Sequence, residues 1–269
     1  MSTALTVQRP LQEPWNLKQI FNFVFGVLTM KKLAFFALSA FAAAAMAAGP
    51  VSPAKIVIAS GATSTQLASF TNLTVSNQSN ANNTAMQNVS SNAGKITVNG
   101  ISSQTTVANG GAMNNESVSK DDFANQNVSS NAGRVTVSMS GESTQYTGMT
   151  NSTLNNKATG GDATALQNLA SNNGDGIRIS GTSAQTVGLT DVTVSNTASG
   201  SHARATQNLS SNFGDVTVAG TSTQTTYVTG GSITNLAKGY RSHAIQNIAS
   251  NDACNEPQDP CPGCNAPRH

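Results

Sequence analysis

Apolar and polar residues alternate one by one along most of this chain from residue 55 onward. In ATQNLSSN, residues 205–212, the side chains Ala205, Gln207, Leu209 and Ser211 share one parity, and the asparagines share the other. A period of two places alternate side chains on opposite faces of a strand, whereas a helix repeats about every 3.6 residues. The pattern therefore predicts short β-strands separated by turns rich in Gly, Ser and Asn.

These strands belong to a repeat of about 40 residues with two signatures. The first is a Gln-Asn pair, preceded by Ala and followed by an aliphatic residue, Ser and Asn. Its glutamines are Gln87, Gln126, Gln167, Gln207 and Gln246, and the asparagines after the serine are Asn92, Asn131, Asn172, Asn212 and Asn251. The second signature is Gly-x-Ser-x-Gln and supplies Gln104, Gln145, Gln185 and Gln224, with Gln66 as the related glutamine of the first, less regular copy.

Gln and Asn have a poor intrinsic preference for strands, so their fixed positions need a physical reason. If like residues stack at the strand spacing of about 4.8 Å, each side-chain amide donates to the copy on one side and accepts from the copy on the other. We therefore expect an all-β fold, a β-solenoid or stacked β-arch array of about five repeats. One repeat per rung is favoured, because whole units resemble each other more than half-units do; a rung per half-unit stays open, as does a disordered low-complexity chain before assembly.

The composition agrees with a thin interior of small side chains. Aromatic residues make up 5% of the chain and charged residues 10%, both low for a globular enzyme. After residue 47 the chain holds ten basic and eleven acidic residues, so it lacks the basic excess of a nucleic-acid binder. We expect no nucleic-acid partner.

The N-terminal region carries a secretion signal. Residues 30–47 have two lysines, an apolar stretch from Leu33, and Ala45 and Ala47 in Ala-x-Ala spacing, which predicts cleavage after Ala47. The apolar run is shorter than the roughly 20 residues of a spanning helix, so no membrane insertion is expected after cleavage. Residues 1–29 are interpreted as an extension before the true start, residues 48–253 as the repeat domain, and residues 254–269 as a tail.

The repeat is out of phase with the ends of the domain. Its first piece, KIVIASGATSTQ at residues 55–66, has no Gln-Asn strand before it, and its last piece, residues 244–252, is a Gln-Asn strand with little after it. Together they make one whole unit. Open solenoid ends can pair with further strands, and contacts that do not close generate filaments. We therefore expect homopolymers assembled head to tail.

The regular Gln and Asn spacing resembles curlin repeats, and the run SSNAGKITVNGISSQTT, residues 90–106, resembles the repeats of Fap-type biofilm fibres more closely. The Cys-x-x-Cys of Cys261 and Cys264 is similar to the tail of the major Fap subunit. The chain departs from both families, because it lacks a curlin consensus and spacers and has an additional Cys254. The resemblance implies a secreted functional amyloid subunit that forms cross-β fibres in the biofilm matrix; the secretion or nucleation partner stays open.

Few residues suggest chemistry. The tail cysteines Cys254, Cys261 and Cys264 are disulfide candidates, one of them left to link neighbours; a zinc site with His269 is the weaker alternative, since the spacing is unusual. No Gly-x-Ser-x-Gly, His-Glu-x-x-His or P-loop motif occurs. We expect no enzyme activity, no cofactor and no metal.

Three functions fit these features. The first is an extracellular structural subunit that self-assembles into fibres for a biofilm matrix or for adhesion. The second is a monomeric β-helix surface adhesin that binds carbohydrate or a host surface through its Asn and Thr faces. The third is a closed ring, in which the two end pieces complete one propeller blade.

Overall fold

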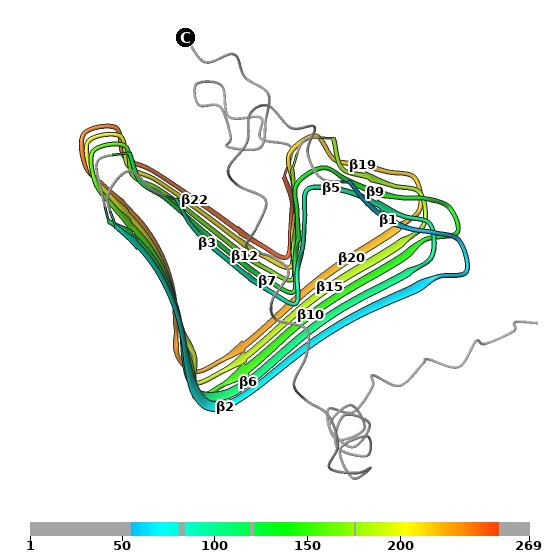
Figure 1. Ribbon diagram of the computed structural model, residues 1–269, viewed down its shortest axis with the longest axis horizontal. Coiled ribbons are helices and arrows are strands. Elements are labelled where there is room, and N and C mark those ends of the chain that lie inside the picture. Colours follow the sequence, from blue (N-terminus) through cyan, green and yellow to red (C-terminus); the bar gives the residue numbers. More distant parts are fainter. Residues whose placement is uncertain (1–54, 81–83, 119–120, 175, 253–269) are drawn as a thin grey trace, which may run out of the picture. The chain divides into compact units, whose positions relative to one another are not determined.

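The computed structural model describes residues 55–80, 84–118, 121–174 and 176–252 (Figure 1). Every regular element in these residues is a β-strand. The expected N-terminal extension, signal peptide and cysteine tail lie outside the described residues.

The strands form four stacks, which we name sheets A to D. Sheet A contains β1 (Lys55–Ile58), β5 (Lys95–Val98), β9 (Val135–Val137), β14 (Arg178–Ile179) and β19 (Thr217–Val218). Sheet B contains β2 (Thr63–Asn80), β6 (Ile101–Val118), β10 (Glu142–Thr150), β11 (Thr153–Thr159), β15 (Thr182–Thr190), β16 (Thr193–Ser199), β20 (Thr221–Thr229) and β21 (Ser232–Lys238). Sheet C contains β3 (Thr84–Val89), β7 (Phe123–Val128), β12 (Thr164–Leu169), β17 (Arg204–Leu209) and β22 (His243–Ile248). Sheet D groups the short strands β4 (Asn92–Ala93), β8 (Asn131–Ala132), β13 (Asn172–Asn173), β18 (Asn212–Phe213) and β23 (Asn251–Asp252).

All strand pairs are parallel, and like residues of successive repeats are aligned. Gln66 pairs with Gln104, Gln104 with Gln145, and Gln145 with Gln185. Residues aligned in this way lie 38 to 41 positions apart in the sequence. The prediction of a β-solenoid with one repeat per rung is confirmed, and the half-unit rung is wrong, because the two glutamines of one repeat lie in different sheets.

The chain makes five complete turns, each running through sheets A, B, C and D. The first rung is β1 to β4 and the last is β19 to β23. A rung therefore begins at the sheet A strand, and neither end rung lacks a sheet. The prediction from the sequence placed the start of the unit two sheets too late, because it took the conspicuous Gln-Asn strand of sheet C as the beginning. Strands β1 and β19 lie at opposite edges of sheet A, which is incompatible with the closed ring.

Each rung folds back on itself, so that the two halves of the long sheet B strand face different sheets. The second half packs against sheet C, where alanines such as Ala124, Ala165 and Ala198 form a thin core. At the bend of sheet B, Met149, Leu154 and Leu169 belong to a larger apolar cluster. The inward aliphatic residues of sheet A make a third cluster. Figure 1 shows the five rungs nested, with the strands of each sheet side by side.

The turn between sheets C and D repeats one unusual backbone geometry. The residue after each sheet C strand has a positive φ between 44° and 50°: Ser90, Ser129, Ala170, Ser210 and Ala249. This left-handed conformation reverses the direction of the chain in a single residue and is uncommon outside Gly, Asn and Asp. The serine that follows holds the turn, since Ser130 Oγ donates to the carbonyl oxygens of Val128 and Asn168. In the first three rungs this serine thus bonds its turn to the next rung.

Candidate functional site: amide ladders and end faces

The glutamines of the Gln-Asn pairs form one continuous hydrogen-bonded column in sheet C. Each Nε2 donates to the Oε1 of the preceding rung, at 2.7 Å from Gln126 to Gln87, 2.9 Å from Gln167 to Gln126, 2.7 Å from Gln207 to Gln167 and 2.5 Å from Gln246 to Gln207. The three middle members are fully buried. Stacking therefore satisfies amides whose burial without partners would cost about 1 to 3 kcal/mol each.

The asparagines of sheet D form a second column, with the opposite direction of donation. Each Nδ2 donates to the Oδ1 of the following rung: Asn92 to Asn131 at 3.0 Å, Asn131 to Asn172 at 2.9 Å, Asn172 to Asn212 at 2.9 Å and Asn212 to Asn251 at 2.8 Å. The same nitrogens also lie near the serine hydroxyls of sheet B, such as Ser143 Oγ at 3.2 Å from Asn131. This column joins sheet D to sheet B as well as rung to rung.

The second-signature glutamines are aligned in sheet B but do not bond to one another. Gln104 and Gln145 donate to the sheet D asparagines Asn131 and Asn172 at 2.6 and 2.7 Å, and Gln66 donates to Asn92 at 2.8 Å. In the last two rungs Gln185 and Gln224 donate to the serine two residues before them. The buried Oε1 atoms of Gln66, Gln104, Gln145 and Gln185 have no hydrogen-bond partner. These five glutamines thus differ from the expected ladder.

Two further columns carry ladders that the candidate residues omitted. In sheet B, Asn77, Asn115, Asn156, Asn196 and Asn235 bond in sequence at 2.7 to 2.8 Å. In sheet C, the asparagines of the Gln-Asn pairs, Asn88, Asn127, Asn168, Asn208 and Asn247, bond at 2.7 to 2.9 Å. The first set recurs at a fixed distance after each second-signature glutamine, and that spacing was the signal available in the sequence.

The asparagine column of sheet B that contains Asn156 and the glutamine column of sheet C that contains Gln207 each donate to the backbone of the other sheet. Asn156 Nδ2 on sheet B donates to the carbonyl oxygens of Ala124 and Leu166 on sheet C, at 3.1 and 2.9 Å. In return, Gln207 Nε2 on sheet C donates to the carbonyl oxygen of Thr234 on sheet B at 3.3 Å. The amides therefore bond along the solenoid axis and across the layers, which small apolar side chains alone would not do.

The last rung of the solenoid presents its interior side chains to solvent, whereas the inward residues Ala85, Gln87 and Val89 of the first rung are buried. In the last rung, Ala244 and Gln246 are exposed and Ile248 is 43% exposed, whereas Ala205, Gln207 and Leu209 one rung earlier are buried. Each ladder begins and ends with the same residue type, for example Gln87 and Gln246, or Asn92 and Asn251. The inward-facing residues of the first and last rungs are uncharged in the described strands of sheets A, B and C. In sheet D of the last rung, Asp252 is aligned with the fully buried Phe213, and its carboxylate accepts from Asn247 Nδ2 at 2.8 Å.

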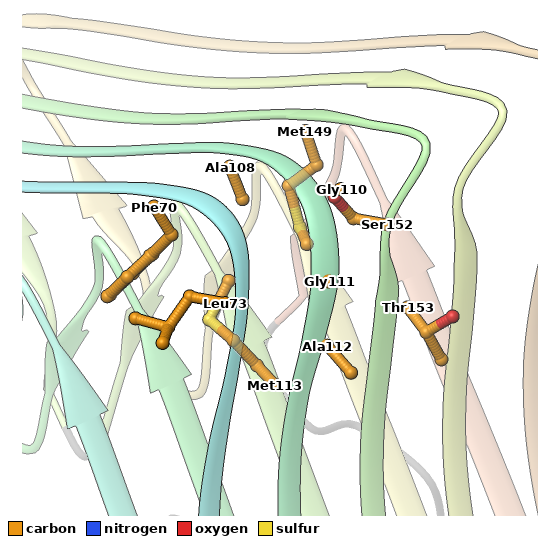
Figure 2. Close-up of a pocket in the computed structure, with 10 residues that line it drawn as sticks. All are labelled: Phe70, Leu73, Ala108, Gly110, Gly111, Ala112, Met113, Met149, Ser152 and Thr153. Atoms are coloured by element: carbon orange, nitrogen blue, oxygen red, sulfur yellow. The ribbon is translucent and has the colours of Figure 1, made fainter.

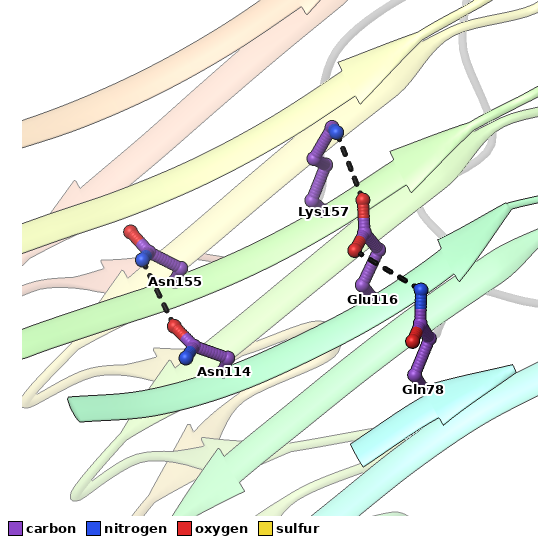
Figure 3. Close-up of polar contacts among 5 residues, drawn as sticks. All are labelled: Gln78, Asn114, Glu116, Asn155 and Lys157. Atoms are coloured by element: carbon purple, nitrogen blue, oxygen red, sulfur yellow. Dashed lines mark hydrogen bonds and ion pairs between the residues drawn. The ribbon is translucent and has the colours of Figure 1, made fainter. Parts of the chain in front are cut away.

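The outer surface of sheet B carries smaller polar networks. Figure 3 shows Glu116 between Lys157 and Gln78: Lys157 Nζ lies 2.8 Å from Glu116 Oε1, and Gln78 Nε2 lies 3.5 Å from Glu116 Oε2. Asn155 Nδ2 donates to Asn114 Oδ1 at 3.0 Å beside them. Because Glu116 and Lys157 are substantially exposed, we expect at most about 1 kcal/mol from their ion pair.

On this surface, the pKa of the Tyr146 side chain is shifted. Tyr146 lies along its own strand toward Gly148, and its ring leaves no room for a side chain there. Partial burial raises the pKa of the Tyr146 phenol above its ordinary value, because desolvation disfavours the phenolate. On another edge His202 Nδ1 pairs with Asp162, and both side chains are about half exposed. Neither arrangement places an acid or base in an enclosed site.

A small gap lies at the bend of sheet B, between Phe70, Leu73, Met113 and Met149 (Figure 2). Its empty volume is about 170 Å³, including open solvent, and its lining is mainly apolar side chains and glycine backbone. Ligand pockets usually enclose about 300 to 1,000 Å³ with a few convergent polar groups. The gap is a packing irregularity where Gly110 and Gly111 replace larger residues.

Among the residues the structure describes, no three His, Cys, Asp or Glu side chains are placed to hold a metal ion. The same residues include no helix with the length and apolar character of a membrane span. The geometry that recurs from end to end is the stack of amides.

The fold and its ladders define a β-solenoid repeat protein whose polar side chains bond from rung to rung. Comparison with protein-family models, curated proteins and solved structures found no match to this chain.

Proposed function

We propose that this chain is a secreted structural subunit, which assembles head to tail into extracellular amyloid-like fibres for a biofilm matrix or for adhesion. The observation that carries the proposal is the match between its two end faces. Every ladder would continue across a junction between two molecules with the same residue type, so that stacking a second copy repeats the contacts already present between rungs. The partner of the chain is then the chain itself.

The direction of the hydrogen bonds supports the same junction. Gln246 Nε2 donates toward the preceding rung, which leaves its Oε1 facing the open end. A Gln87 from a second molecule would donate to that atom, as Gln126 donates to Gln87. The Asn column would continue in the opposite sense, from Asn251 to the Asn92 of the second molecule. The junction would leave no buried amide unpaired in these columns.

The end faces also lack the usual protection of sheet edges. Natural edge strands are blunted by inward charges, proline or bulges that prevent pairing with another chain, and solenoids carry polar caps. The described strands of the first and last rungs carry no proline, and their inward-facing positions in sheets A, B and C carry no charge. The one carboxylate that a second copy would cover in sheet D, Asp252, accepts from Asn247 Nδ2, so burying these faces would desolvate no unpaired charge. The resemblance to Fap-type and curlin repeats is consistent with this proposal.

Electron microscopy and fibre diffraction of the purified mature chain test the proposal. We expect unbranched filaments that bind amyloid dyes and give a meridional reflection at about 4.7 to 4.8 Å, with strands perpendicular to the fibre axis. A protein that stays monomeric at high concentration, under all the solution conditions in which it is folded, would overturn it.

In the alternative function, a monomeric adhesin, the outward-facing threonines of sheet B would bind the ligand. Thr71, Thr150, Thr190 and Thr229 occupy one aligned column on that face, broken by Asn109. This function requires saturable binding of a carbohydrate or surface ligand by the monomer. Binding that persists when filament formation is blocked would favour it over the structural role.

A further inference from the structure

We propose that the fibre junction has a single polarity, the last rung of one molecule on the first rung of the next, and that Asp215 and Lys55 form an ion pair across it. This inference rests on the proposed function and names the contact that orients it. It comes from one outward-facing column at the edge of sheet A. The column consists of Lys55, Lys95, Arg134, Gly176 and Asp215.

The strand registers define this column. Lys55 pairs directly with Lys95, and the alignment of Ile96 with Val135 places Lys95 beside Arg134. The alignment of Arg178 with Thr136 and with Thr217 places Gly176 and then Asp215 in the same line. The Asp215 carboxylate occupies the space beside Gly176, where its Oδ2 lies 3.7 Å from the position of a Cβ on that glycine. The column thus begins with three cations and ends with an anion.

Within the part of the chain that the structure describes, Lys55 has no acidic neighbour in its column. Its partner in the column is Lys95, and neither Lys55 nor Asp215 has an ion-pair partner among the described residues. Asp215 lies four rungs away, about 19 Å at the strand spacing. That distance exceeds the Debye length of about 8 Å at physiological ionic strength, so the two charges are screened from each other. Stacking a second copy would bring them to adjacent positions, about 4.8 Å apart along the column.

The reverse contacts do not offer this complementarity. In a contact between two first rungs, Lys55 is the sole charged residue of each described rung 55–93, so no acid is present. In addition, each Gln87 would present a donor to the other Gln87, while two last rungs would present Gln246 Oε1 to Gln246 Oε1. Strands would also meet antiparallel, whereas every pair within the chain is parallel. Charge, amide direction and register favour the same polarity.

Disulfide trapping tests the polarity directly. Aligned residues on adjacent parallel strands have Cα atoms about 4.8 Å apart, within the range of about 4.4 to 6.8 Å that a disulfide spans. Two variants of the full chain are prepared, Lys55→Cys and Asp215→Cys, each with Cys254, Cys261 and Cys264 replaced by Ser. Each variant is assembled alone, the two are also assembled together from a mixture of monomers, and all three samples are then oxidised. We expect linked heterodimers in the mixture alone. Linked homodimers of either variant, or filaments without any linked product, would overturn the proposal.

A charge exchange tests the ion pair. In seeded growth at low salt, we expect Asp215→Lys to elongate about tenfold more slowly, because attraction between exposed charges becomes repulsion, and we expect Lys55→Asp combined with Asp215→Lys to restore the rate. The matched control is Glu142→Lys, an exposed column position in a middle rung, which should elongate like the unmodified chain. Equal rates for all variants, or no recovery in the double variant, would overturn the pair. Absence of filaments from the unmodified chain would instead contradict the proposed function.

Discussion

At the scale of single residues, the buried glutamines of sheet B and those of sheet C are both aligned from rung to rung, but they form different hydrogen bonds. Gln167 both donates to Gln126 and accepts from Gln207. Gln145 donates to Asn172, which already accepts from Asn131, and its own Oε1 has no partner. Both side chains are fully buried, so exposure does not separate them. Their contributions to stability should differ because the consequences for their neighbours differ.

The substitution Gln167→Met should therefore cost more than Gln145→Met. Methionine keeps the length of the side chain but neither donates nor accepts strongly. At residue 167 it leaves Gln126 Oε1 without a donor and deprives Gln207 Nε2 of its amide acceptor, for a loss of about 2 to 4 kcal/mol. At residue 145 it removes an unsatisfied buried oxygen and leaves Asn172 with another donor, so the expected change is within about 1 kcal/mol. Urea unfolding of both variants measures the difference; equal losses would contradict this account of the ladder.

The sequence predicts the sheet C ladder because identical residues recur with identical neighbours. It could not predict the behaviour of Gln104 or Gln145, because their acceptors lie 27 residues further along the chain. That contact exists only once sheet D has folded back over the first half of sheet B. Periodicity reports which residues are aligned between rungs, whereas the choice of partner within a rung depends on the path of the chain.

Glycine at close contacts provides a second test at this scale. A Cβ at Gly200 would overlap the carbonyl oxygen of Gly160 in the rung below, whereas a Cβ at Gly188 would find its nearest neighbour, the Tyr146 hydroxyl, at 3.9 Å. Both glycines belong to the fourth rung. We expect Gly200→Ala to destabilise the fold by more than about 1 kcal/mol, because the rungs would have to separate. Gly188→Ala should be neutral or stabilising by up to about 1 kcal/mol, since alanine restricts the unfolded chain. Thermal unfolding of the two variants separates these outcomes, and a larger loss for Gly188→Ala would show the stacking contact to be unimportant.

At the scale of the elements, the bend of sheet B concentrates the apolar packing of the rung. The alanine core between sheets B and C and the amide columns contribute little apolar area, so the bend cluster carries most of the larger side chains. The low aromatic content predicted a thin interior, and this is what the two-layered rung shows. The sequence did not predict where the larger aliphatic residues gather, because the bend lies inside a continuous alternating stretch, as in the single strand β6.

Two leucines of sheet B allow the packing at the bend to be compared with that on the outer face. Leu154 is fully buried in the bend cluster, whereas Leu67 is 61% exposed. Leu154→Ala should reduce the free energy of unfolding by about 2 to 5 kcal/mol, because it leaves a cavity that stacked neighbours cannot fill. Leu67→Ala should change it by less than about 0.5 kcal/mol, as expected for a surface position. Urea titrations at one pH provide the comparison, and similar midpoints for both variants would mean that the bend is loosely packed.

At the scale of the whole molecule, the five described rungs repeat the same parallel register, and their first and last sheet A strands, β1 and β19, lie at opposite edges of that sheet. A fold of this kind has a stability close to the sum of rung and interface terms. The end faces are set by the first and last rungs alone, so the number of rungs between them is not fixed by the geometry. The number of rungs and the proposed polymerisation should therefore be separable.

Deletion of one complete rung tests this independence. Removing residues 133–173 joins Ala132 to Gly174, so that β8 is followed by the sheet A strand of the fourth rung and every column stays in phase. We expect a folded four-rung protein that retains its β-sheet circular dichroism and its filaments, because both end faces are unchanged. Its urea m-value should fall by about one fifth, in proportion to the surface buried. Removing residues 151–173 instead leaves sheets C and D one strand short while sheet A keeps all five, which interrupts the Gln and Asn ladders. That variant should lose cooperative unfolding, and if it behaved like the complete-rung deletion, the ladders could not be what sets the register of the solenoid.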